Sequence, residues 1–156
     1  MSIETKLGKF LFLFLLSVFI FSACDKNENE GDGWANCTEC TTDSWVGEYS
    51  GTGDYSNFNN NTEMNNVDVS IVIEETATDY LTVYFHVPDV YSSTVSGDLQ
   101  SPDIVSFASS GSSFTATMFI KDNELKLTGN SKKFHYKNDT ILILDEVVTF
   151  ETIKNQ

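Results

Sequence analysis

From Trp45 onward, apolar and polar residues alternate with a period of two along most of the chain. The pattern is clear over residues 45–54, 67–74 and 80–87, where every second side chain is apolar or glycine. Such alternation is typical of strands with one face on a core and the other in water. Further strands are predicted over residues Asp89–Ser96, Ile104–Ala108, Ser113–Ile120, Glu124–Thr128, Lys132–Lys137, Thr140–Leu144 and Val147–Ile153.

Short turn signals separate these segments, among them Asp122-Asn123, Gly129-Asn130 and Asn138-Asp139. Such residues favour tight turns. The Asn-rich stretch 57–66 is predicted to be a long polar loop, and the strand over Ile141–Leu144, apolar at every position, is expected to be covered on both sides. Without a helical period, about ten short antiparallel strands predict an all-β domain, either a small up-and-down barrel or a β-sandwich.

The N-terminus follows a different pattern. Lys6 and Lys9 precede an apolar run, Phe10 to Phe21, in which Ser17 is the one polar residue, and the sequence Phe21-Ser22-Ala23-Cys24 closes the segment. About 12 residues are too few to span a bilayer, which needs about 20 helical residues. The arrangement fits a secretory signal peptide, and residues 1–23 are therefore expected to be removed.

The four residues ending in Cys24 resemble a bacterial lipobox, with Phe21 where the family usually has Leu. The resemblance implies a lipid anchor on Cys24, and two or more acyl chains hold a protein stably on a membrane. We therefore expect a lipoprotein of the cell envelope, on the outer membrane. Whether it faces the periplasm or the cell surface stays open.

Residues 24–42 are polar and acidic and lack a periodic pattern. They are expected to form a flexible tether, with the folded domain over residues 43–156. The first 23 residues carry a net charge of +1, so the rest of the chain has −15 rather than −14, and it contains no Arg. Phosphate backbones are gripped by clustered Lys and Arg, so nucleic acid is not an expected partner.

Ser44-Trp45-Val46-Gly47-Glu48-Tyr49-Ser50-Gly51 resembles the first strand of lipocalin-like (calycin-like) domains in bacterial lipoproteins, although true lipocalins place Gly before Trp. The resemblance implies an up-and-down barrel with Trp45 at one end. Gly47, Gly51 and Gly53 would let the strand coil and the opposite wall approach.

Cys37 and Cys40 form the only spacing with chemical content. In an oxidising envelope a local disulfide is the plain outcome. A redox pair, half of a zinc site and two idle thiols are the alternatives. No other catalytic, cofactor or metal motif is present, so we expect no enzyme and no cofactor.

Two functions remain, and the oligomeric state is open for both. The first is a binding module whose lumen or rim holds a small apolar or amphipathic ligand, with Trp45, Tyr49, Tyr80, Tyr84 and His86 as candidate contacts. Alternatively, the barrel is filled by its own side chains and its surface docks a partner, as a structural or interaction protein. Seven aromatic side chains could either fill a small barrel or wall a pocket: Phe85, Phe107, Phe114, Phe119, Phe134, Tyr136 and Phe150.

Overall fold

The computed structural model describes residues 32–138 and 140–156. The expected signal peptide and Cys24 lie outside the described residues. The chain divides into two compact units, of which the second, Trp34–Gln156, contains all the secondary structure discussed below. Its elements are β1 (Ala35–Asn36), α2 (Thr42–Trp45), β2 (Gly47–Asn57), β3 (Thr62–Ala77), β4 (Tyr80–Val87), β5 (Tyr91–Asp98), β6 (Ile104–Ala108), β7 (Ser112–Lys121), β8 (Glu124–Lys137) and β9 (Ile141–Lys154).

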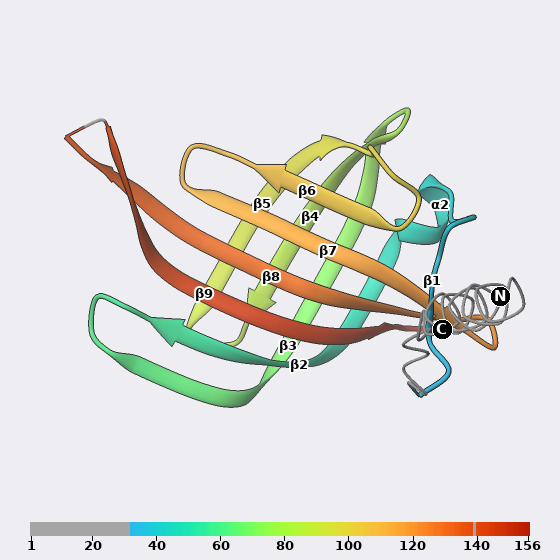
Figure 1. Cartoon of the computed structure of the whole chain (residues 1–156), viewed down its shortest axis with the longest axis horizontal. Coiled ribbons are helices and arrows are strands. Elements are labelled where there is room, and N and C mark those ends of the chain that lie inside the picture. The colour runs from blue at the N-terminus through green and yellow to red at the C-terminus, as the bar shows by residue number, and fades with distance from the viewer. Residues whose placement is uncertain (1–31, 139) are drawn as a thin grey trace, which may run out of the picture. The chain divides into compact units, whose positions relative to one another are not determined.

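The prediction of an all-β, antiparallel fold is confirmed. Nine strands form one sheet in the order β1-β7-β8-β9-β2-β3-β4-β5, and β6 also pairs with β7. Consecutive strands are neighbours from β2 to β5 and again from β6 to β9, which is up-and-down order. The sheet is not closed by hydrogen bonds, because β5 and β6 do not pair. It coils instead, so that β3, β4 and β5 cross behind β6 and β7 (Figure 1).

The last strand, β9, pairs with the first long strand, β2, in the middle of the sheet. Gly51 permits this junction: a Cβ atom there would lie 2.1 Å from the carbonyl oxygen of Glu151 and 2.7 Å from the Cα of Thr152. A residue with a side chain therefore could not occupy this position without moving the β9 backbone.

The core lies on the concave face of the sheet. Phe85 on β4 packs against Phe114 on β7 and Phe150 on β9, with ring centroids 6.1 and 5.2 Å apart, and Phe114 stacks on Phe150 at 5.5 Å. All three side chains are buried. Aromatic rings from opposite walls thus meet in the middle of the coiled sheet.

The compact unit begins at Trp34 rather than near Asp43, because residues that we had placed in the tether pack on the sheet. Cys37 and Cys40 are joined by a disulfide, and both are buried. The Sγ of Cys40 lies 3.2 Å from the Sδ of Met118, and the N–H of Cys37 donates to the Met118 carbonyl. Acidity and lack of periodicity suggested a tether, whereas the disulfide and β1 fix this segment to β7.

Trp45 lies at the end of the short helix α2, not on the first strand as the lipocalin resemblance implied. It is fully buried, and its Nε1 donates to the carbonyl of Pro102 at 2.9 Å. The hydroxyl of Tyr49, also buried, lies 2.9 Å from the Trp45 carbonyl. Lys154 donates to the Ser44 carbonyl at 2.9 Å. One end of the coiled sheet is therefore sealed by Trp45 and Tyr49, whose side-chain polar atoms are hydrogen-bonded.

Two predicted breaks in the strands are wrong. The Asn-rich stretch is no long loop, since β3 already begins at Thr62; the Asn57 side chain accepts from the backbone N–H groups of Asn59 and Asn60 and so closes a short turn. Gly129-Asn130 is not a turn either and lies within β8. A Cβ at Gly129 would meet the Thr115 carbonyl at 2.0 Å, so this glycine permits a close approach of β7.

Candidate functional site

The hairpin of β8 and β9 continues beyond the rest of the sheet as a two-stranded ribbon, which we define as Phe134–Lys137 and Ile141–Leu144 (Figure 1). β7 pairs with β8 only as far as Lys133, and β2 pairs with β9 only as far as Glu146. The ribbon therefore has no paired strand on either edge within the described residues.

The ribbon exposes apolar side chains. Ile141, Leu142 and Tyr136 are 56%, 54% and 53% exposed. The prediction that Ile141–Leu144 is covered on both sides is therefore wrong for this chain by itself. Nearby, the β2–β3 turn exposes Phe58. Clustered apolar groups in water mark interaction surfaces more often than isolated ones do.

A bulge sets the base of the ribbon. Lys133 pairs with Glu146 and Phe134 with Leu144, so Asp145 is an extra residue on β9. Its carboxylate oxygens lie 2.8 and 2.9 Å from Nδ1 of His135, and one of them accepts from the Asn59 side chain at 3.0 Å. These hydrogen bonds, that to His135 first, hold the pKa of Asp145 below its usual value. Bulges bend a strand and re-aim it, and this one is bonded to the β2–β3 turn.

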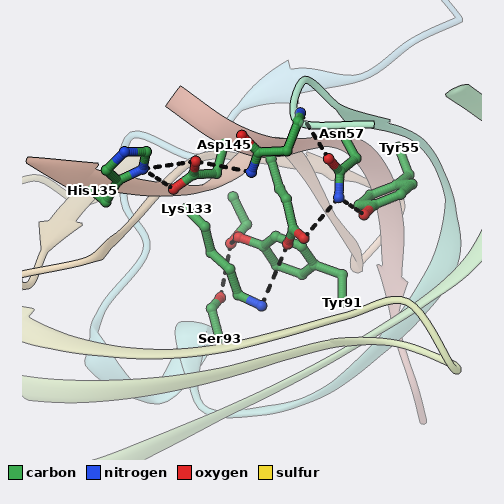
Figure 2. A network of polar contacts seen from close by, with 10 residues as sticks. Tyr55, Asn57, Tyr91, Ser93, Lys133, His135 and Asp145 are labelled. Carbon is green, nitrogen blue, oxygen red and sulfur yellow. Dashed lines mark hydrogen bonds and ion pairs between the residues drawn. The ribbon is translucent and has the colours of Figure 1, made fainter. Parts of the chain in front are cut away.

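Behind the bulge, polar side chains from β2, β8 and β9 form a network (Figure 2). Lys133 Nζ lies 3.4 Å from Oε2 of Glu146, an ion pair without an aligned hydrogen bond. Oε1 of Glu146 accepts from Asn57 Nδ2 at 3.1 Å, and Asn57 Nδ2 is also 3.1 Å from the Tyr55 hydroxyl. Three neighbouring strands are thereby tied together where the ribbon leaves the sheet.

A second part of the network crosses the coiled sheet from β8 to β5. The hydroxyl of Ser131, fully buried, lies 2.8 Å from the Tyr91 hydroxyl and 2.9 Å from that of Ser93. Lys133 Nζ stands 4.6 Å above the Tyr91 ring. Burial raises the pKa of the Tyr91 phenol, and the bonds to Ser131 and Ser93 offset part of that rise. The phenol therefore remains a neutral partner of Ser131.

The candidate ligand contacts do not come together. Tyr80, Tyr84 and His86 lie on the outer face of β4, because Leu81, Val83, Phe85 and Val87 occupy its core face. Trp45 and Tyr49 are buried at the sealed end. His86 lines a surface hollow of about 300 Å³ with Tyr91 and Lys133, and these two residues were not anticipated from the sequence.

In the described part of the chain no three or more His, Cys, Asp and Glu side chains gather where they could hold a metal ion, and no helix has the length and apolarity to cross a membrane. A scan against family models, a search of curated proteins and a search of solved structures each found no match.

Proposed function

We propose that this chain is a lipid-anchored envelope protein without catalytic activity, which presents the ribbon to a protein partner. The observation that carries the proposal is the division of the apolar side chains. Most pack into one continuous core, whereas Tyr136, Ile141 and Leu142 stay exposed on the ribbon. The anchor rests on the sequence Phe21-Ser22-Ala23-Cys24.

The packing of the core favours a protein partner over a ligand in a lumen. Phe85, Phe114 and Phe150 occupy the centre, where a lipocalin-like domain would hold its ligand. In small coiled sheets the side chains themselves fill the interior. The surface is then the place where specificity can lie.

A small apolar or amphipathic ligand is the second candidate, and the hollow beside Tyr91, Lys133 and His86 is its best location. At about 300 Å³ this hollow lies at the lower limit of typical ligand pockets. The ammonium group of Lys133 and the phenol of Tyr91 line this hollow. These groups would suit a polar headgroup better than an acyl chain. The hollow therefore supports this function less strongly than the ribbon supports docking.

Mass spectrometry of the full chain extracted from membranes tests the lipid anchor and distinguishes the proposed function from small-ligand binding. Under denaturing conditions we expect the mass of residues 24–156 plus covalent lipid, and the Cys24→Ser variant should lack that lipid. Under native conditions we expect no further small-molecule mass. An unlipidated wild-type chain would refute the anchor. A reproducible non-covalent excess, lost on denaturation, would favour the small-ligand function instead.

A further inference from the structure

The two free edges of the ribbon are chemically different. On β8 the edge is flanked by Lys133, His135 and Lys137. On β9 the edge over Ile141–Leu144 carries no charge and no proline, and its bulge comes only afterwards, at Asp145. Lysine, proline and bulges are the usual means by which proteins prevent an edge from pairing with another strand. The β9 edge lacks all three over four residues.

A bilayer is a poor occupant for this edge. Backbone N–H and C=O groups of an open edge would find no partners in hydrocarbon. Another strand can satisfy this edge, and the exposed Tyr136, Ile141 and Leu142 offer that strand apolar contacts.

The charge distribution bears on whether a second copy of this chain can supply the strand that pairs with the β9 edge. Residues 34–120 contain 12 acidic residues and no Lys or Arg, whereas residues 121–156 contain six acidic residues and six lysines. Two copies of this chain would repel each other through β2 to β6. The ribbon carries one lysine, Lys137, and no acidic residue, and it projects from the sheet, so it lets two copies meet while their acidic strands stay apart.

We propose that Ile141–Leu144 pairs antiparallel with the same segment of a second copy, which joins two ribbons into one four-stranded sheet. An uncharged apolar strand matches itself in this register, because apolar residues face apolar residues across the two-fold axis. If the two-fold axis passes beside Leu142, the Leu142 residues of the two copies lie opposite each other. If it passes beside Ile143, the two Ile143 residues do so instead. This inference rests on the proposed function, since it names the partner of the ribbon.

Cysteine cross-linking in the full, membrane-bound chain tests the pairing. Residues directly opposite each other have Cβ atoms about 4.5–5.5 Å apart, within reach of a disulfide. We expect either Leu142→Cys or Ile143→Cys to give a covalent dimer of this chain alone after mild oxidation, at least 5-fold more than the other. Thr94→Cys, exposed on the outer face of β5, is the matched control and should give none.

The outcomes distinguish the pairing of two copies from the broader proposal that the ribbon docks a protein partner. Equal yields from Leu142→Cys, Ile143→Cys and Thr94→Cys would indicate random collision and overturn the pairing. A cross-link from the ribbon to a different protein would overturn the second copy as partner but support docking through the ribbon. If the ribbon cysteines cross-link to nothing, even with a longer bifunctional reagent, both proposals fail.

Discussion

The two ends of the coiled sheet differ in the environment that they give to tyrosine and lysine side chains. At the sealed end Tyr49 is buried and Lys154 donates to a backbone carbonyl. At the other end Tyr136 is exposed, and Lys133 forms an ion pair with Glu146 at the base of the ribbon. The sealed end and the core supply stability, whereas the ribbon contributes almost none to the isolated chain. A two-stranded hairpin by itself is marginally stable in water.

The largest expected effect comes from emptying the core. Phe114→Ala removes a buried ring that stacks on Phe150 and should lower the free energy of unfolding by about 3–5 kcal/mol. Leu142→Ala on the exposed ribbon should change it by about 0.5 kcal/mol or less in the monomer. Urea denaturation at low protein concentration measures both. Similar losses from the two variants would show that the contrast between core and ribbon is mistaken.

A smaller loss is expected where β2 meets β9. Gly51→Ala places a methyl group against the backbone of Glu151 and should cost about 1–3 kcal/mol. Gly111→Ala is the matched control, because its Cβ would lie 3.6 Å from the nearest atom, the Phe134 carbonyl, in ordinary contact. The same denaturation experiment applies to both. A tolerated Gly51→Ala would mean that this junction is looser than its geometry indicates.

The smallest expected effect is a dependence of the unfolding free energy on pH, to which a buried tyrosine at each end contributes. Burial raises the pKa of both Tyr49 and Tyr91, so the folded state favours the neutral phenols. Their contribution is fully present below the unfolded value of about 10 and is lost as pH rises toward the folded values. Through Tyr49 alone, the unfolding free energy should fall by about 1 kcal/mol between pH 9 and pH 10.5. Tyr91→Phe should make the pH dependence of the unfolding free energy shallower; an unchanged slope would assign this dependence to groups other than Tyr91.

The alternation of apolar and polar residues predicted β6 at its observed bounds and placed β4 correctly, because a one-sided strand has one periodic pattern. It also contained the information that Tyr84 and His86 face water, since Val83 and Phe85 are the more apolar alternative. The Ile141–Leu144 segment misled, because an apolar pattern cannot tell whether a covering element exists within the same chain.

The polar network was beyond prediction for a different reason. Its hydrogen bonds join residues far apart in sequence, such as Tyr91 with Ser131 and Asn57 with Glu146. Only the coiling of the sheet brings them together, and no local motif records it. The bulge at Asp145 is similarly hidden, because a single extra residue leaves both flanking patterns intact.

The position of β9 also determines when this protein can fold. Because β9 follows the other strands in sequence and lies between β8 and β2, the sheet can be completed only after β9 has been synthesised. Before then β2–β5 and β6–β8 are two separate meanders, and the edges of β2 and β8 that pair with β9 are unpaired. Contacts so distant in sequence make folding slow. The two meanders can therefore be joined only after β9 has emerged, which delays the core that Phe85, Phe114 and Phe150 share.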